Sequence, residues 1–269
     1  MYPILKYPGA KWRLAPWVLS HMPPHESYLE PYFGSGAIFF LKEKSRIETI
    51  NDLDGEVVNF FRVCRDYPAE LANAVSLTPW AREERDAAYQ PEAVSDIERA
   101  RRFAVKCWMT FGAFPAKSNG WRHTTGKMKD GGPDNPTLWG RLPECIAEAA
   151  GRLMQAQIEN RPALEVVRAH DGPQVLIYAD PPYLRQTRTA SGDAYNHEMT
   201  DADHVALLLA LKEHKGMVLL SGYDSGLYRD MLPGWTCKQA NTTAERGAKR
   251  TECLWINEAA RQYTYSLFA

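Results

Sequence analysis

One apolar segment constrains the fold of this chain more than any other feature. Residues 174–179 read QVLIYA, an apolar run without a charged side chain. A strand of this kind is buried on both faces, which is typical of a parallel sheet covered by helices. The run is followed by a predicted helix over residues 201–215 and by a second apolar strand over residues 216–220.

The N-terminal part of the chain repeats this alternation of strand and helix. Short strands are predicted at residues 27–30 and 48–52, and helical stretches at residues 37–44 and 55–65. Near the C-terminus, two β-rich segments at residues 235–242 and 250–256 predict an antiparallel pair. The pattern therefore predicts an α/β fold with a mostly parallel sheet.

The middle of the chain differs from both ends in its composition. A helix is predicted over residues 92–111, followed by a Gly-, Pro- and Asn-rich segment over residues 111–140. Long irregular loops inside compact domains are uncommon and usually functional. We interpret this region as an inserted recognition module.

The sharpest chemical motif, Asp180-Pro181-Pro182-Tyr183, follows the apolar strand directly. Ligands of open α/β sheets bind beyond the carboxyl ends of the strands. The Asp180 carboxylate and the Pro181 carbonyl can accept the two N–H bonds of an exocyclic amine on a base, which localises its lone pair for attack. Both prolines fix φ, and Tyr183 can stack on a base taken out of its helix. Taken alone, the motif also fits a turn that ends a strand.

A second motif, residues 30–36 (EPYFGSG), places two glycines one residue apart after a strand. Such glycines let a backbone approach a nucleotide-like ligand closely. Phe39 stands where a dinucleotide fingerprint would have its third glycine, which disfavours a nicotinamide oxidoreductase. Asp52, after the next strand, can accept hydrogen bonds from ribose hydroxyls. Each feature alone also fits an ordinary turn, but together they predict a site for a ribose-bearing cofactor without a pyrophosphate.

Four motifs in a fixed order carry a resemblance to a known family. They are residues 6–11 (KYPGAK), 30–36 (EPYFGSG), 51–54 (NDLD) and 180–183 (DPPY). In this order they resemble the Dam-type, or D12 class, DNA adenine-N6 methyltransferases, over essentially the whole chain. The resemblance implies a Rossmann-like S-adenosylmethionine-dependent methyltransferase fold with a seven-stranded mixed sheet. It also implies a catalytic domain over residues 1–65 and 153–269, with an inserted, mainly helical target-recognition domain over residues 66–152.

The same resemblance implies roles for single residues. The expected catalytic residues are Asp180, Pro181, Pro182 and Tyr183. The expected contacts to S-adenosylmethionine are Tyr7, Lys11, Glu30, Phe33, Gly34, Gly36, Asp52 and Asp180. Lys11 is expected near the methionine carboxylate, and Asp52 at the ribose. We expect no metal, because the sulfonium already supplies a good leaving group and positioning dominates.

The sequence also departs from the family. Ala10 stands where the first motif often has a second glycine, a change we expect to be harmless. Residues 111–121 lack the Asn-Gly-Leu-x-Arg-x-Asn-like stretch that GATC-specific members often carry. We therefore do not extend GATC specificity to this chain.

Duplex DNA is the expected partner, although the net charge is only -1. Residues 99–152 hold ten Lys and Arg against four Asp and Glu, so a basic insert is offset by an acidic remainder. A local positive patch is what phosphate contact requires. The predicted DNA contacts are Lys117, Asn119, Arg122, Lys127, Lys129, Arg185, Arg188, Arg246, Lys249 and Arg250.

Two other functions stay open at this stage. The amine could belong to cytosine N4 or to a protein glutamine, but Asp at position 180 and the inserted module favour adenine in DNA. The chain could also be a catalytically silent DNA-binding protein, which the intact motif at residues 180–183 disfavours.

The remaining expectations concern the environment of the protein. No segment approaches the roughly 18 consecutive apolar residues of a membrane span, and the N-terminus lacks the apolar core of a signal peptide, so we expect no membrane partner and a cytoplasmic location. The five cysteines form no metal-binding spacing and are expected to be reduced and mostly buried. We expect a monomer or weak dimer, and a cognate restriction enzyme stays open as a further partner.

Overall fold

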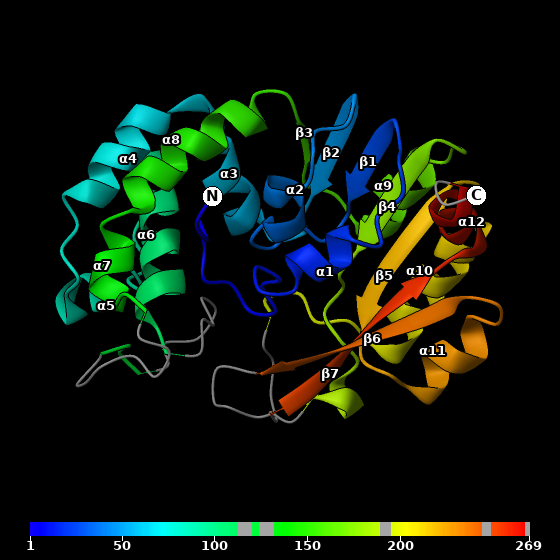
Figure 1. Ribbon diagram of the computed structural model, residues 1–269. Helices are drawn as coiled ribbons and strands as arrows, with labels where there is room; N and C mark the ends of the chain where they lie inside the picture. The colour runs from blue at the N-terminus through cyan, green and yellow to red at the C-terminus, as the bar shows by residue number, and fades with distance from the viewer. Residues whose placement is uncertain (112–119, 124–131, 189–194, 244–248, 267–269) are drawn as a thin grey trace. The chain divides into compact units, whose positions relative to one another are not determined.

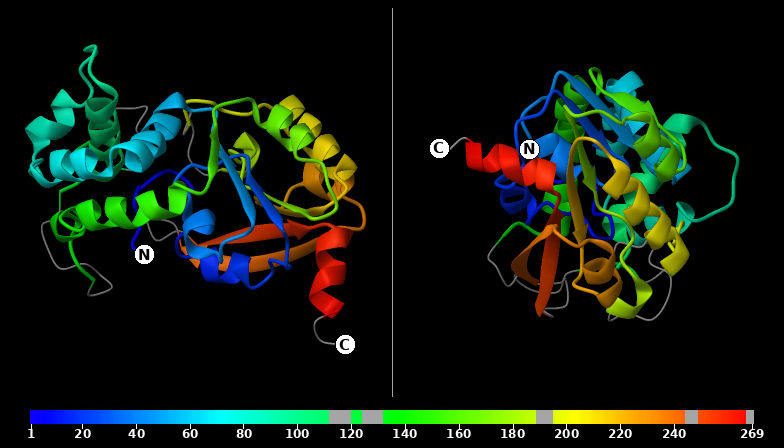
Figure 2. Two further views of the ribbon diagram at one scale, coloured as in Figure 1. Left: turned by 90° about the horizontal axis from the view of Figure 1, so that it is seen from above. Right: turned by 90° about the vertical axis from the view of Figure 1, so that its right-hand side faces the viewer.

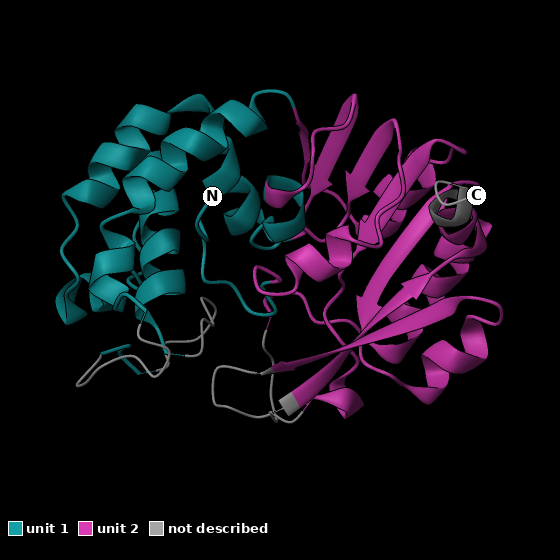
Figure 3. Cartoon of the chain, viewed as in Figure 1, with its two compact units in different colours: residues 1–10, 34–40, 54–155 teal, residues 11–33, 41–53, 156–269 magenta. Residues whose placement is uncertain are grey.

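The computed structural model describes residues 1–111, 120–123, 132–188, 195–243 and 249–266. These residues form two compact units (Figure 3). The helical unit comprises residues 1–10, 34–40 and 54–155, and the sheet unit comprises residues 11–33, 41–53 and 156–269.

The sheet unit contains one seven-stranded sheet with the order β3-β2-β1-β4-β5-β7-β6 (Figure 1). The strands are β1 (Ser27–Glu30), β2 (Ile47–Asn51), β3 (Gln157–Glu159), β4 (Val175–Ala179), β5 (Met217–Gly222), β6 (Thr236–Thr243) and β7 (Lys249–Ile256). The first five strands run parallel, whereas β7 pairs antiparallel with both β5 and β6. The predicted α/β fold with a seven-stranded mixed sheet is confirmed.

The connections place a topological switch point beside β1. From β1 the chain moves outward to β2 and β3, and it then returns to add β4 on the other side of β1. Ligands of open α/β sheets bind at such a point, beyond the carboxyl ends of the strands. The residues that follow β1 and β4 are therefore the ones that the fold places for function.

Helices cover both sides of the sheet. They are α1 (Ala15–Leu19), α9 (Ala163–Ala169), the short 3-10 helix η1 (Arg185–Thr187), α10 (Asp201–Glu213), α11 (Gly226–Met231) and α12 (Glu258–Ser266). Apolar residues of α9, α10 and α11 form one core with Ile177 and Val218 of the central strands. Figure 2 shows α12 on the opposite side of the sheet from α10. This double cover explains why β4 is apolar along its length.

The helical unit is built around α6. Its helices are α3 (Gly55–Asp66), α4 (Pro68–Ser76), α5 (Arg82–Ala87), α6 (Asp96–Met109), α7 (Asn135–Trp139) and α8 (Leu142–Leu153), together with most of α2 (Ala37–Leu41). Helix α6 packs against α3, α4 and α5, and α8 packs against α3 and α4. The helix predicted from residue 92 begins only at Asp96, because the Ser95 hydroxyl accepts the backbone N–H of Glu98 as an N-cap.

The segment predicted as one irregular loop, residues 111–140, contains regular structure in its described part. Asp134 caps α7 by accepting the backbone N–H of Thr137, and an isolated β-bridge joins Thr110 to Trp121. The prediction missed α7 because the helix is short and begins with Asn135-Pro136, residues that also favour turns. The assignment of residues 66–152 to target recognition stays a prediction.

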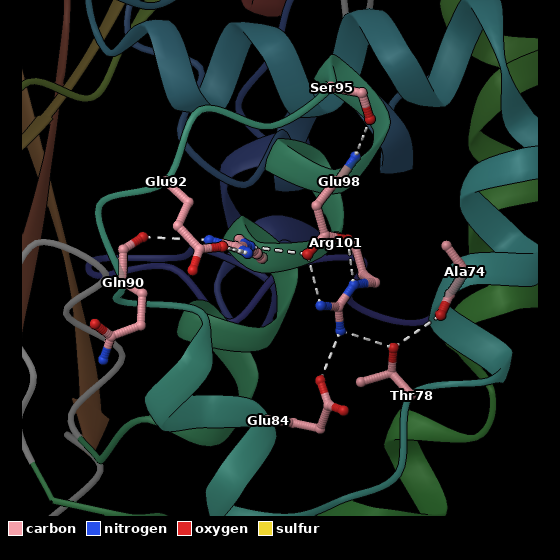
Figure 4. Close-up of polar contacts among 9 residues, drawn as sticks. Ala74, Thr78, Glu84, Gln90, Glu92, Ser95, Glu98 and Arg101 are labelled. Carbon is pink, nitrogen blue, oxygen red and sulfur yellow. Dashed lines mark hydrogen bonds and ion pairs between the residues drawn. The ribbon is translucent and has the colours of Figure 1, made fainter.

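Arginines of α6 are neutralised within the helical unit (Figure 4). Arg101 donates to Glu98 from two of its nitrogens at 2.7 Å each, and to Glu84 at 2.9 Å. Arg102 bonds Glu98 and Glu92, and Arg99 bonds Glu56 and Asp96. All of these acids lie outside residues 99–152, and the whole helical unit holds fifteen basic and fourteen acidic residues. Helix α6 therefore does not supply the positive patch that the charge count predicted.

All five cysteines are free thiols, and only Cys237 is partly exposed, as expected. Among the helices formed by described residues, none has the length and apolar character needed to cross a bilayer. Nor do the described His, Cys, Asp and Glu side chains include a group of three or more placed to hold a metal ion.

Candidate active site

The carboxyl ends of three neighbouring strands carry the polar residues of the candidate site. Glu30 is the last residue of β1, Asp180 follows β4, and Asp52 follows β2. Strands β1 and β4 pair in register from Ser27 opposite Val175, so Glu30 and Asp180 end their strands at the same edge. The switch point is thus lined by carboxylates.

Lys11 and Asp180 form a buried ion pair at this edge. The Lys11 ammonium nitrogen lies 2.9 Å from Oδ2 of Asp180. The first turn toward α1 fixes Lys11, whose carbonyl accepts the backbone N–H groups of Leu14 and Ala15. Burial alone would lower the pKa of Lys11, but Asp180 and then Glu252 hold that pKa above its usual range. Lys11 therefore stays charged.

The Asp180 carboxylate is left half satisfied. Its Oδ1 atom is buried and has no hydrogen-bond partner among the described residues. Burial raises the pKa of Asp180, and Lys11 only partly opposes this shift. An unpartnered buried acceptor is costly, and such atoms often mark a site where a ligand supplies the missing donor. Oδ1 is thus available to an N–H group of a bound substrate.

Tyr183, three residues further on, is held from several sides. Its hydroxyl donates a hydrogen bond of 2.6 Å to Oε2 of Glu252 on β7. The Lys11 ammonium lies over the Tyr183 ring, 4.8 Å from its centroid, and Tyr223 packs edge-on against the same ring with centroids 4.7 Å apart. Burial, followed by the charges of Asp180 and Glu252, raises the pKa of Tyr183 well above its usual value. Tyr183 is therefore a neutral, fixed aromatic ring beside Asp180.

Glu30 is fixed from within its own strand. The Tyr28 hydroxyl donates to Oε2 of Glu30 at 2.7 Å, because side chains two residues apart on a strand share one face. Burial, followed by Glu30, raises the pKa of Tyr28 well above its usual value, which keeps Tyr28 protonated as the donor.

Asn51 ties together the two loops around the end of β2. Its side-chain amide donates to the carbonyls of Pro31 and Arg161 at 3.0 Å each, and its Oδ1 accepts the Arg161 backbone N–H. The backbone N–H of Phe33 donates to the Asn51 carbonyl at 2.9 Å. Asn51 thereby positions the start of the glycine turn. Sequence reasoning missed this role, although a buried Asn at a strand end is a usable signal.

The remaining cofactor candidates, Tyr7, Gly34 and Gly36, lie in the helical unit. Gly34 and Gly36 have φ values of 50° and 67°, a left-handed conformation that favours glycine. A Cβ on Gly34 would lie 3.2 Å from Cδ1 of Tyr7. The structure therefore brings Tyr7 against Gly34 and explains why this turn uses glycine.

The structure describes only some of the residues predicted to contact DNA. Lys117, Asn119, Lys127, Lys129 and Arg246 lie outside the described residues, and of Lys249 only the backbone is described, in β7. Arg122 donates twice to the Thr110 carbonyl. Arg188 is partly buried, forms an ion pair with Glu198 and lies over the Tyr195 ring. Arg185 is exposed, and Arg250 donates to the Tyr223 hydroxyl at 2.9 Å.

Sequence reasoning also missed Glu252 and Tyr223. Glu252 is 8% exposed and directly precedes the four apolar residues that end β7, so an acidic residue next to an apolar β-rich run was the available signal. Without the pairing of β7 to β5, nothing in the sequence places Glu252 beside Tyr183. The structure thus brings together Lys11, Asp180, Tyr183 and Glu252, of which sequence analysis named the first three.

Comparisons with known proteins point in one direction. A family model described as D12 class N6 adenine-specific DNA methyltransferase matches residues 7–109 and 139–242. The type II methyltransferase M1.LlaDCHI from Lactococcus lactis subsp. cremoris is 27% identical over 273 residues, covering 95% of this chain and 93% of that protein.

Two solved structures are similar at a low level. The Escherichia coli protein yhhF is 11% identical, with a TM-score of 0.37 and coverage of 93% of this chain and 82% of that one. The precorrin 8w decarboxylase of Methanobacterium thermoautotrophicum is 9% identical, with a TM-score of 0.39 and coverage of 96% and 95%. Scores this low do not establish a common fold.

Proposed function

The chain belongs to the D12 class N6 adenine-specific DNA methyltransferase family, and on that premise we propose that it methylates the N6 amine of an adenine flipped out of duplex DNA. The observation that carries the proposal is the buried, unpartnered Oδ1 of Asp180, held in place by Lys11 and next to the fixed ring of Tyr183. A carboxylate acceptor beside an aromatic face suits an amine on a planar base.

S-adenosylmethionine is the methyl donor of this family, and the residues present suit it. Glu30 ends β1 and Asp52 follows β2, the next strand along the chain. Their carboxylates can accept hydrogen bonds from ribose hydroxyls or from an ammonium group. The backbone at Gly34 carries no Cβ that would block a close approach. When bound, the cofactor supplies an activated methyl group on a sulfonium, so no metal is needed to create a leaving group. Tyr7, Lys11, Phe33 and Gly36 complete the set that we propose holds it.

The chain's own residues then act by holding the amine. We assign to Asp180 Oδ1 and the Pro181 carbonyl the two N–H bonds of the adenine N6 amine, and to Tyr183 the face of the base. Accepting both bonds turns the lone pair toward the methyl group and away from the ring. The N6–carbon bond forms as the sulfur–carbon bond breaks, one amine proton is released, and N6-methyladenine and S-adenosylhomocysteine result. Lys11 keeps Asp180 ionised and oriented throughout.

Binding to duplex DNA is part of the same proposal. Cationic side chains and Asn119 in the two segments around residues 112–119 and 124–131 would contact phosphates and base edges, with Arg185 and Arg250 beside the site. Arg188 already forms an ion pair with Glu198, so we do not assign it to DNA contact. The related type II methyltransferase is consistent with a restriction-modification context.

A direct assay tests the proposal. Purified protein is incubated with S-adenosylmethionine labelled in its methyl group and with unmethylated duplex DNA of diverse sequence, and the DNA is digested to nucleosides. Labelled N6-methyladenine is the expected product. Label in N4-methylcytosine would replace the substrate assignment, and absence of label even in a single turnover would indicate a silent DNA-binding protein.

A further inference from the structure

The buried carboxylate of Glu252 lies beside the site and has no role in the proposed mechanism. Glu252 is on β7, one residue before Cys253, which pairs with Gly222 at the end of β5. It is 8% exposed, and the five residues that follow it are all buried. A charged side chain at such a position is costly unless it is paired. A buried charge at this position of β7 therefore calls for a role.

Glu252 contacts the site through Tyr183. The phenol donates to Oε2 of Glu252 at 2.6 Å, a short charge-assisted bond. The ring is held at the same time by Tyr223, whose hydroxyl accepts from Arg250. Because one end of the ring is anchored to β7 and the other end joins the backbone after β4, the ring plane beside Asp180 is fixed.

Glu252 also acts on the charges of the site. One ammonium, Lys11, faces two carboxylates, Asp180 and Glu252, and both attract it. The pKa of Asp180 is raised first by burial and is lowered by Lys11, and Glu252 raises it again. The titratable groups around this cluster are Lys11, Asp180, Glu252, Tyr183, Tyr178, Tyr195, Tyr228, Glu30, Tyr223 and Arg250. The charge of Glu252 thus offsets part of the effect of Lys11 on the pKa of Asp180.

We infer that Glu252 is a positioning residue for methyl transfer, which fixes the Tyr183 ring against the target base and strengthens Asp180 as the acceptor for the N6 amine. This inference rests on the proposed function, because it assigns Glu252 to the same reaction. The physical reason is that a more basic carboxylate accepts a hydrogen bond more strongly. A fixed ring also spares the entropy of ordering the base in each turnover.

The test separates the charge of Glu252 from its hydrogen bond. Glu252→Gln keeps an oxygen that accepts from Tyr183 but removes the negative charge. We expect kcat to fall roughly tenfold, as for groups that act through another residue. The acidic limb of the kcat/KM profile should move to lower pH, because the pKa of Asp180 falls without Glu252. Tyr183→Phe keeps the ring and removes the hydroxyl, which lowers the pKa of Asp180, so this variant should lower kcat without moving the acidic limb to lower pH.

Controls keep the inference distinct from the function on which it rests. Glu258→Gln, at an exposed position at the start of α12, should leave both kcat and the pH profile unchanged. An active wild type together with a Glu252→Gln enzyme of unchanged kcat and unchanged pH profile overturns the inference alone. A wild type that labels no DNA overturns the proposed function instead. If Glu252→Gln does not fold, Tyr183→Phe decides: unchanged kcat contradicts the positioning role.

Discussion

Lys11 binds only one side of the Asp180 carboxylate. Its ammonium lies 2.9 Å from Oδ2, whereas Oδ1 is buried and, within the described part of the chain, has no partner. A purely structural ion pair would gain by satisfying both oxygens, since buried pairs stabilise only when their remaining lone pairs are bonded. The difference between the two carboxylate oxygens is therefore better explained by a substrate donor at Oδ1.

Replacing Asp180 should stop methyl transfer while sparing much of cofactor binding. Asp180→Ala removes the acceptor of the N6 amine, and we expect kcat to fall by roughly 10²- to 10⁴-fold, the usual range for a group that takes part in proton handling. Single-turnover methylation measures the rate, and calorimetric titration with S-adenosylmethionine measures binding. Full activity in this variant would remove Asp180 from the mechanism.

Removing the partner of Asp180 should change the pH dependence. Lys11 lowers the pKa of Asp180 more than any other group, so in Lys11→Met the effect of burial dominates and that pKa rises. The carboxylate must be ionised to accept the amine, so the acidic limb of kcat/KM should move to higher pH, opposite to the movement in Glu252→Gln. Lys212→Met, at an exposed position of α10, is the matched control. An acidic limb that stays in place would show that Asp180 titration does not govern the rate.

The glycine turn should be sensitive to a single methyl group. Gly34→Ala forces a non-glycine residue into φ 50° and places its Cβ 3.2 Å from Tyr7. The left-handed conformation alone costs about 1–2 kcal/mol, and displacement of the turn should weaken S-adenosylmethionine binding by roughly tenfold. Gly226→Ala is a matched control, because its added Cβ meets nothing within 4 Å and its φ is not positive. Equal dissociation constants for the two variants would contradict a role of this turn in binding.

The periodicity of apolar residues and the order of the motifs predicted most of the fold and three of the four residues that the structure brings together at the end of β4. The apolar run of β4 and the alternation around β1 and β2 indicate a parallel sheet, because burial on both faces leaves a direct mark on the sequence. Asp180 and Tyr183 were found because their motif follows a strand end. Asn51 and Glu252 were not found, because their roles depend on loops and strands brought together by the fold, such as Arg161 against Asn51. Contacts between residues so far apart leave no periodic signal.

The charge count over residues 99–152 was a poor guide to where a positive patch lies. Residues 99–152 look basic, yet Arg101 bonds Glu84 and Glu98, which lie just before that window. A window follows the chain, whereas ion pairs form between neighbours in space. This distinction can be tested by comparing two kinds of basic residue.

The arginines of α6 should stabilise the protein and not bind DNA. Arg101 is 15% exposed and sits in the network of Figure 4, so Arg101→Met removes the bonds to Glu84 and Glu98, although Glu98 keeps its bond to Arg102. We expect a loss of about 1–3 kcal/mol in the free energy of unfolding, measured by urea denaturation, and an unchanged dependence of DNA affinity on salt. The double variant Lys127→Gln and Lys129→Gln should leave the free energy of unfolding unchanged and weaken the dependence of DNA affinity on salt. If both lysines contact phosphates, the slope of log affinity against log salt should become shallower by about two, measured by fluorescence anisotropy from 50 to 200 mM salt. A shallower slope for Arg101→Met would restore α6 as a DNA-binding element, and an unchanged slope for the double lysine variant would remove Lys127 and Lys129 from the phosphate contacts.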